Sequence, residues 1–397
     1  MIAGSCGRDC SRGPSFRLAC ADETIVTAGV AYRLAASGEA LSRAAERRLA
    51  ETDDGAARIV VGALPFDSRE RAQLFQPVSV DRRASRAPAH APRDLSGSRG
   101  LAPLHLRAEP AAEAYRESVA AALARIRART STARLEKVVL ARSLVVEMAE
   151  AIDVDHLVER LSADPSAMTY ATPLRARDGG ERVLVGATPE LLVDKRGARV
   201  RSHPLAGSAR RSPDASQDRA AADSLRRSEK DAREHALVAE WIGDTLAPFC
   251  ATLRVPKTPT LTATQTMWHL ASDIEGTLRD PSMSSLRLAQ LLHPTPAVCG
   301  TPRELARETI AALEPFDRGC YAGAVGWCDD TGDGRWLVAI RCAEIAGTTA
   351  RLFAGAGIVD GSDPQGELLE TAAKFGALLR ALEIDPCAPA LAIPELA

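Results

Sequence analysis

The pattern of apolar and polar positions predicts a mixture of strands and helices along the chain. Residues 25–30 and 57–64 have the apolar, β-branched composition of strands, and residues 41–49 between them have helical spacing. Residues 109–129 place apolar side chains on one face and charges on the other, which predicts an amphipathic helix packed on a core. The β-branched run at residues 137–146 then favours a strand.

The second half of the chain continues this mixture. Strands are predicted at 182–187, 191–193, 198–202, 321–327, 336–343 and 350–354. Helices are predicted at 228–246, 286–292, 303–313 and 367–382. No period of 20–50 residues repeats, which argues against a solenoid. The predicted fold class is therefore α+β with strand-rich blocks.

Three segments lack the large apolar side chains of a folded core. We expect residues 1–20 to be a disordered amino tail and residues 386–397 to be a carboxyl tail. Residues 81–105 are rich in Arg, Ala, Pro, Ser and Gly, a composition typical of a mobile linker. The remaining chain, residues 21–385, is expected to form one large domain.

Composition and charge point to a soluble globular protein with a small-molecule partner. Of 397 residues, 46% are hydrophobic and 26% charged, and the 50 basic residues are balanced by 52 acidic ones, which gives no electrostatic case for nucleic acid. No run of about 18 apolar residues predicts a membrane span. The nine cysteines are odd in number and scattered, so we expect free thiols and a cytoplasmic location.

Two acidic pairs are candidates for a metal site. Asp231 and Glu234 share one face of the helix predicted at 228–246, and Glu367 and Glu370 repeat the spacing, followed by Lys374 one turn later. If the two faces meet, four carboxylates converge, and such a density of like charge requires a hard divalent cation such as Mg²⁺ or partial protonation. The alternative is two solvated helix faces, with Glu370 and Lys374 forming an ordinary ion pair.

Lys137 and Glu190 are candidates for acid–base chemistry. Lys137 begins the strand at 137–146, and if that face of the strand lines a cavity, desolvation makes the amine a candidate general base. Glu190 follows a proline between two predicted strands, where burial would keep it protonated and able to donate. The ordinary alternatives are an edge or snorkelling lysine and a turn carboxylate.

Two glycine-bearing segments, 205–210 and 353–357, match no nucleotide-binding loop. Their glycines would let backbone N–H groups approach a ligand carboxylate, which Arg341 could also bind in bidentate fashion. Tight turns explain the same segments equally well. Among the histidines, only His269 is placed in the candidate pocket.

Five short sequence motifs in the last third of the chain resemble those of a known family, and their order along the chain strengthens the resemblance. They are HPTPA at 293–297, EPFDR at 314–318, IRCA at 340–343, FAGAG at 353–357 and GELLE at 366–370. This order resembles the chorismate-binding enzyme family, and Lys137, Glu190 and Glu234 make the chain most similar to isochorismate synthases of the siderophore type. The match covers roughly residues 110–385, and it implies a core of two sheets surrounded by helices.

The resemblance implies a role for each candidate. The residue matching Lys137 acts as base on a water that attacks C2 of chorismate, and the residue matching Glu190 acts as acid on the departing C4 hydroxyl. Magnesium is held by the residues matching Glu234 and Glu370, with those matching Asp231 and Glu367 acting through water. The positions similar to substrate contacts are Gly207, Ser208, His269, Ala297, Tyr321, Ile340, Arg341, Phe353, Gly355 and Lys374.

The resemblance also separates branches of the family. Members that use ammonia and a glutaminase partner typically have glutamine where this chain has Lys137, so we expect a monomer that uses water and needs no glutaminase subunit. Thr188 stands where serine is frequent and Tyr321 where phenylalanine is frequent, and neither replaces a proposed catalytic group. Two alternatives remain open, a salicylate synthase and a catalytically silent chorismate-binding homologue.

Overall fold

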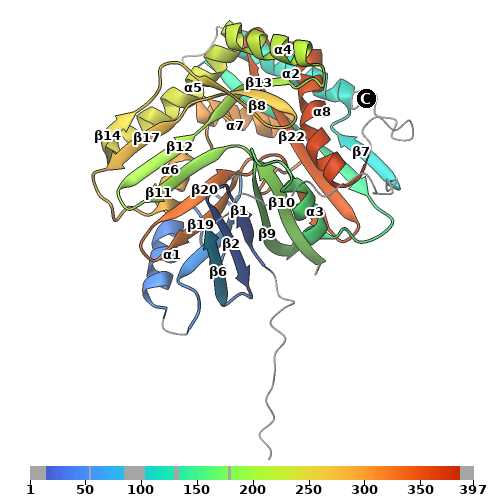
Figure 1. Cartoon of the computed structure of the whole chain (residues 1–397). Coiled ribbons are helices and arrows are strands. Elements are labelled where there is room, and N and C mark those ends of the chain that lie inside the picture. The colour runs from blue at the N-terminus through green and yellow to red at the C-terminus, as the bar shows by residue number, and fades with distance from the viewer. Residues whose placement is uncertain (1–14, 53–54, 85–102, 129–133, 178–179, 385–397) are drawn as a thin grey trace, which may run out of the picture.

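The structure is a computed structural model that describes residues 15–52, 55–84, 103–128, 134–177 and 180–384. Within these residues the strands form two large antiparallel sheets and one small sheet. Most helices gather in the upper part of Figure 1, and the strands from the amino end lie in its lower part. The predicted α+β class, with helices around a core of two sheets, is confirmed.

The larger sheet has ten strands and carries the strand that begins at Lys137. Its spatial order is β18 (Gly300–Thr301), β8 (Lys137–Glu147), β22 (Thr349–Val359), β21 (Cys342–Ala346), β10 (Gly180–Thr188), β9 (Met168–Arg177), β1 (Arg17–Ala19), β2 (Glu23–Ala28) and β6 (Ser79–Ala84), with β7 (His105–Glu109) also paired to β8. The pairing of β8 with β22 runs over eleven residues of each strand. This long antiparallel pair is the frame on which the site is built.

The second sheet has nine strands and the third has three. The nine-stranded order is β14 (Cys250–Arg254), β17 (Ile274–Leu278), β12 (Arg199–His203), β11 (Leu191–Arg196), β20 (Gly334–Val338), β19 (Ala324–Asp329), β4 (Ile59–Leu64), β5 (Gln73–Gln76) and β3 (Tyr32–Arg33). The small sheet consists of β13 (Leu205–Arg210), β16 (Met267–Ala271) and β15 (Thr260–Ala263).

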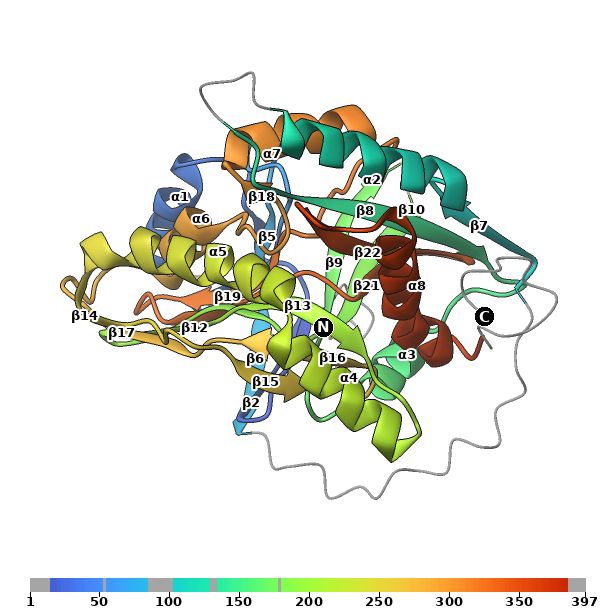
Figure 2. The same ribbon diagram turned by 90° about the horizontal axis from the view of Figure 1, so that it is seen from above.

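Eight α-helices cover these sheets within the described residues (Figure 2). They are α1 (Ala40–Ala50), α2 (Ala112–Arg127), α3 (Val154–Leu161), α4 (Ala215–Arg227), α5 (Glu229–Leu246), α6 (Ser285–Leu292), α7 (Arg303–Leu313) and α8 (Pro364–Ala381). The helix predicted at 228 begins where expected, because the Ser228 hydroxyl accepts a hydrogen bond from the Asp231 N–H.

Two apolar cores hold the layers together. The larger joins both large sheets and the inner faces of α1, α2, α5, α6 and α7, with Trp327 and Trp336 fully buried in it. The smaller packs Phe375 of α8 and Leu157 of α3 against the ten-stranded sheet. Helix α8 is therefore anchored by its apolar face, which leaves its acidic residues to face elsewhere.

The structure corrects three predictions: the end of the amino tail, the start of the linker and the strand at 336–343. Phe16 and Leu18 are fully buried and β1 pairs with β9, so residues 15–20 belong to the fold rather than to a tail. Residues 81–84 belong to β6 rather than to the linker, and the rest of that linker as far as residue 102 lies outside the described residues, as does the carboxyl tail. The single strand predicted at 336–343 is two strands in different sheets, separated at Arg341 by a left-handed backbone.

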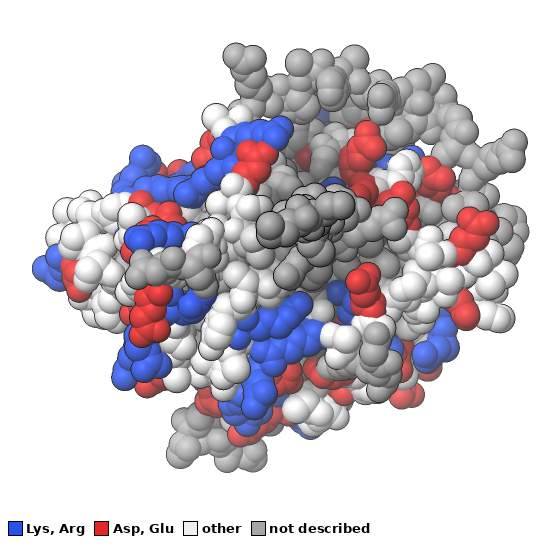
Figure 3. Space-filling view, turned by 90° about the horizontal axis from the view of Figure 1, so that it is seen from below, with Lys and Arg blue, Asp and Glu red and all other residues white. Residues whose placement is uncertain are grey.

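Within the described residues the cysteines are free, as predicted, and charges of both signs share the surface shown in Figure 3. Six cysteines there are free and buried: Cys20, Cys250, Cys299, Cys320, Cys328 and Cys342. On the face shown in Figure 3, basic and acidic side chains lie beside one another. No described helix is both long enough and apolar enough to cross a bilayer.

Candidate active site

A pocket opens where the β8–β22 pair meets the small sheet and helices α5 and α8. All ten residues predicted as substrate contacts line it: Gly207, Ser208, His269, Ala297, Tyr321, Ile340, Arg341, Phe353, Gly355 and Lys374. Glu190, Glu234 and Glu370 line it as well. The structure thus brings thirteen of the sixteen predicted residues to one pocket, although they come from positions 190 to 374 of the chain.

Glu190 reaches the pocket from the junction of β10 and β11. Its backbone N–H donates to the Thr188 hydroxyl at 3.2 Å, and its carbonyl accepts from the Val338 N–H at 3.1 Å, so both flanks of the residue are fixed. The side chain is only 3% exposed. Burial raises the pKa of Glu190 to about 8, against the smaller opposing effects of the Leu205 N–H and Lys137. A carboxyl with this pKa is protonated at neutral pH and can donate a proton.

Lys137 lies behind the pocket wall, at the start of β8. It is fully buried, and its Nζ lies 3.0 Å from Oε1 of Glu234. The two groups are at ion-pair distance but lack the alignment of a hydrogen bond, so the contact is an electrostatic one. Lys137 is not part of the pocket lining, whereas Glu234, with which it is paired, is.

The acidic faces of α5 and α8 converge, as the spacing of their carboxylates predicts if both face the same site. The pKa of Glu367 is raised by burial and by the negative charge of Glu370, and the pKa of Asp231 is raised by burial and by the negative charges of Glu234 and Glu370. The contacts show the convergence: Lys230 of α5 pairs with Glu367 of α8 at 2.8 Å, and Glu234 and Glu370 line the same pocket, although the ordinary Glu370–Lys374 ion pair is also present. The alternative of two separate solvated helix faces is therefore wrong.

Three lysines neutralise this acidic cluster. Lys137 pairs with Glu234 at 3.0 Å, Lys230 of α5 pairs with Glu367 of α8 at 2.8 Å, and Lys374 pairs with Glu370 at 2.6 Å. Within the described residues, no three His, Cys, Asp or Glu side chains already stand in a metal-binding arrangement. The chemistry of the donors nevertheless suits a hard cation, because Glu234 and Glu370 line the same pocket and the charge of Glu370 also acts on Asp231, which brings carboxylate oxygens of both helices near one another.

Glycines make room for two of the carboxylates. A Cβ at Gly357 of β22 would lie 2.2 Å from Oε1 of Glu234. At Gly207 the backbone is left-handed, with φ of 76°, and a Cβ would lie 2.9 Å from Cβ of Asp231. Both glycines lie within strands, so the tight-turn interpretation of the two segments is wrong.

Arg341 and His269 form the basic side of the pocket. Arg341 has a left-handed φ of 51° and is 7% exposed, and its Nη2 donates to Nε2 of His269 at 3.4 Å. Burial lowers the pKa of His269 well below its usual range, with the Arg341 charge acting in the same direction. The histidine is therefore neutral and accepts a hydrogen bond, and the guanidinium keeps its charge for an anionic ligand.

The opposite wall is aromatic. The rings of Tyr321 and Phe353 stack at 4.9 Å between centroids and 8° between planes. A Cβ at Gly355 would lie 2.7 Å from the Tyr321 hydroxyl, so glycine leaves space for that ring. Lys374 is fixed beside this wall because its Nζ also donates to the Gly355 carbonyl at 2.7 Å.

Sequence reasoning missed two residues that hold the site. Lys230 gave no signal beyond an ordinary charge at the start of a helix, although it bridges α5 and α8. Arg318 was noted only as part of the EPFDR motif. Its buried guanidinium donates to the carbonyls of Val139 and Val298 and to the Glu314 carboxylate. The same carboxylate accepts a hydrogen bond from the Ala141 N–H. This buried clamp ties β8 to the segment that carries Ala297.

The free volume of the pocket is small, about 70 Å³. A ring-sized ligand therefore requires side chains such as Lys374 to rotate out of their present contacts on binding. A second cavity near α1, α6 and α7 is roomier, at about 300 Å³, but contains none of the predicted catalytic groups. Because the candidate acid and carboxylates line the smaller pocket, that pocket is the candidate active site despite its smaller free volume.

The two-sheet fold thus carries a pocket to which a buried carboxyl, a buried amine and the acidic faces of two helices contribute. A family model described as chorismate binding enzyme matches residues 26–383, and the chain belongs to that family.

Within this family, the chain is similar to several proteins named isochorismate synthase. The chain is similar to isochorismate synthase DhbC of Bacillus subtilis (46% identity, 82% of this chain and 81% of the relative) and to isochorismate synthase EntC of Escherichia coli K12 (44%, 81% and 80%). It is also similar to the crystal structure of a putative 2,3-dihydroxybenzoate-specific isochorismate synthase, DhbC, of Bacillus anthracis, with a TM-score of 0.87, 39% identity and coverage of 95% and 98%. The predicted resemblance to isochorismate synthases is confirmed.

Proposed function

We propose that this protein is an isomerase that converts chorismate to isochorismate. One observation carries the proposal: a buried, protonated carboxyl and a buried amine belong to the same site as the carboxylates of two helices. Relatives named isochorismate synthase, at 44–46% identity over about four fifths of the chain, support it.

Glu190 is the acid in this reaction. The C4 hydroxyl of chorismate is a poor leaving group until it is protonated. A carboxyl with a pKa of about 8 carries a proton at neutral pH and can donate it to that hydroxyl. Proton transfer releases the C4 oxygen as water, and the ring double bonds shift towards C4.

Lys137 is the base. In its neutral form it takes a proton from a water molecule as that water forms the new bond to C2, so one water enters and one leaves and the atoms balance. The amine lies at the start of β8, with its Nζ 3.0 Å from Oε1 of Glu234. It must be free of its own proton before it can accept one.

Magnesium completes the proposed site. Glu234 and Glu370 would hold it directly, and Asp231 and Glu367 would do so through water, which requires the lysines now paired with three of them to give way. When bound, the ion supplies charge neutralisation for the ring carboxylate of the substrate. Arg341 and the backbone near Gly207 and Gly355 orient the second carboxylate.

A salicylate synthase is the closest rival, since it would share the acid, the amine and the metal but would add loss of pyruvate. The test is to incubate the purified protein with chorismate and magnesium and to separate the products by chromatography. Isochorismate as the main product supports the proposal. Salicylate with pyruvate would replace the proposal with its rival, and unchanged chorismate would favour the silent homologue.

The remaining proposals concern partners and location. Lys137 suits water rather than ammonia as nucleophile, so we propose that the protein needs no glutaminase subunit. The resemblance favours a monomer, and the scattered free thiols favour a cytoplasmic location. Sedimentation of the purified chain, at concentrations spanning two decades, checks the monomeric state: a single species with the mass of one chain is expected.

A further inference from the structure

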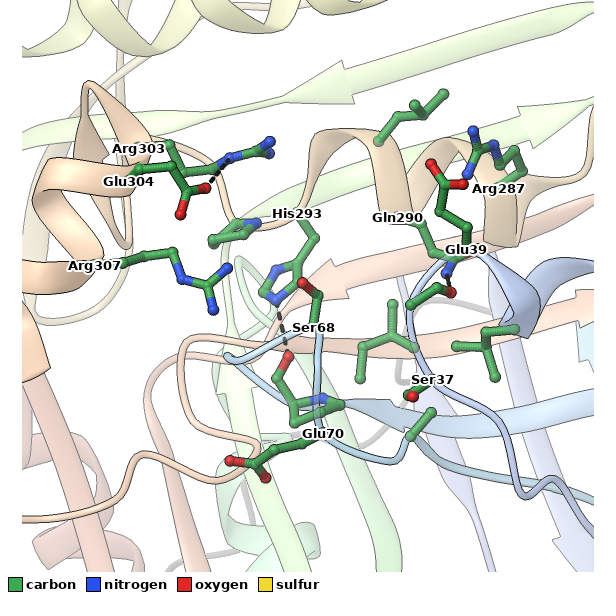
Figure 4. Close-up of a pocket in the computed structure, with 17 residues that line it drawn as sticks. Ser37, Glu39, Ser68, Glu70, Arg287, Gln290, His293, Arg303, Glu304 and Arg307 are labelled. Carbon is green, nitrogen blue, oxygen red and sulfur yellow. Dashed lines mark hydrogen bonds and ion pairs between the residues drawn. The ribbon is translucent and has the colours of Figure 1, made fainter.

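The roomier cavity lies apart from the active site, between α1, α6 and α7 (Figure 4). The loop that follows β4 closes one side, and the first turns of α1 and α7 close two others. Its volume of about 300 Å³ suffices for a small ring compound. The reaction proposed above uses none of its lining residues.

The polar side chains of its lining form two groups, and each group contains both arginine and glutamate. Arg303, Glu304 and Arg307 lie at one end in Figure 4, and Arg287, Glu39 and Gln290 lie at the other. Arg307 is held by Asp67 at 2.7 Å, and Arg303 contacts Glu304 only at 4.0 Å. Arg287 takes part in none of the ion pairs found among the described residues. Arg303 also lies 5.8 Å from the ring centroid of Trp241, so within the described residues neither Arg303 nor Arg287 has a close carboxylate partner and both can pair with an anion.

At the end of the cavity that carries Arg287, one buried acceptor has no hydrogen-bond partner within the described residues. Gln290 donates to the Gly38 carbonyl through Nε2, but its buried Oε1 has no partner in the described part of the chain. An unsatisfied buried acceptor is costly, and a ligand hydroxyl would satisfy it. Glu39 beside it is a second acceptor for such a donor.

Helix ends reinforce the preference for an anion. The N-terminal residues of α1 and α7, Glu39 and Pro302, make no side-chain capping hydrogen bond, so neither helix satisfies its first N–H groups in that way. Both helix ends border the cavity, where the helix dipole favours negative charge. Apolar side chains form the remaining walls: Leu41, Leu64, Pro65, Leu291 and Pro294.

We propose that this cavity binds a small ring compound that carries a carboxylate and at least one hydroxyl group, independently of the active site. The carboxylate pairs with Arg303 or Arg287, the hydroxyl donates to Gln290, and the ring packs on the apolar walls. The cavity and the catalytic pocket share no lining residue, but one chain segment connects them: His293 and Pro294 line the cavity, and Ala297 and Val298 line the catalytic pocket.

Calorimetric titration with 2,3-dihydroxybenzoate tests the proposal. The wild type should bind it with a Kd of about 1 mM or tighter, and the double variant Arg287→Gln/Arg303→Gln should bind at least about tenfold more weakly, the loss that 1.4 kcal/mol produces. The control is Arg43→Gln/Arg47→Gln, which removes the same charge from exposed positions of α1 outside the cavity lining and should bind like wild type. Catechol, which lacks the carboxylate, should bind as weakly as the double variant binds the acid.

Turnover of chorismate by the double variant should stay within about twofold of wild type, which shows that the fold and the active site are intact. Equal binding of 2,3-dihydroxybenzoate by wild type and the double variant would overturn the proposal, because the compound would then sit in the catalytic pocket. Absence of binding by the wild type in the millimolar range would overturn it as well.

Discussion

At the scale of single residues, burial of Glu190 sets the pH range of the proposed reaction. Its pKa is raised to about 8, so the carboxyl donates a proton only below that pH. We predict that kcat falls above pH 8, approaching about tenfold per pH unit. Glu190→Gln should lose about 10²-fold or more of kcat and remove this limb of the profile. A wild-type profile that is flat to pH 10 would contradict the assignment.

The same shift predicts how stability depends on pH. The folded pKa of Glu190 lies above the ordinary value of 4.5, so the folded state binds the extra proton between pH 4.5 and about 8. Stability contributed by this group is therefore full below pH 4.5 and is lost as pH rises through that window. Relative to wild type, Glu190→Gln should gain thermal stability from pH 5 to pH 9. The exposed control Glu117→Gln should show no such trend.

Gly357 gives a steric prediction. A methyl group there would meet Oε1 of Glu234 at 2.2 Å and Cε of Lys137 at 3.2 Å, so Gly357→Ala should displace the carboxylate and cut kcat by about 10²-fold. Gly376→Ala on α8 is the control, because its added methyl meets only the end of Arg380 at 3.3 Å. Equal activity of the two variants would show that the position of Glu234 does not matter.

At the scale of elements, the Arg318 clamp holds β8 against the segment before β18. Arg318 is 4% exposed, and its removal leaves Glu314 buried without its cation. Arg318→Gln should therefore lower the free energy of unfolding by about 3–5 kcal/mol, as measured by urea denaturation. Arg125→Gln, on the exposed face of α2, should change it by less than about 0.5 kcal/mol. A loss of that small size in Arg318→Gln would refute the clamp.

Elements with strong periodicity were predictable from sequence, and those set by tertiary context were not. Helix α7 was predicted at its observed bounds because its apolar spacing and the preceding proline mark it locally. The break between β20 and β21 was missed, because the left-handed conformation of Arg341 is imposed by the site and not by its own preference. The small sheet was also missed, since β15 and β16 are short and neither is strongly alternating.

At the scale of the whole molecule, the site exists only because α5 and α8 meet. The sequence marked both acidic faces, but only the fold shows that Lys230 joins them through Glu367. We predict that Lys230→Gln lowers the thermal midpoint in the absence of metal, because four carboxylates lose a counter-charge. Added Mg²⁺ should then raise the midpoint more in this variant than in wild type. The exposed control Lys257→Gln should respond like wild type, and an equal response of all three would argue against a shared cation site.

The origin of the new hydroxyl group tests the central claim most directly. If water attacks C2 while the C4 hydroxyl departs, isochorismate formed in H₂¹⁸O during the first turnovers must carry one ¹⁸O atom, at C2. The measurement is mass spectrometry of the product from wild-type protein, chorismate and magnesium. Product without ¹⁸O would mean that the hydroxyl group moves within the substrate, and the roles of Lys137 and Glu190 would have to be abandoned.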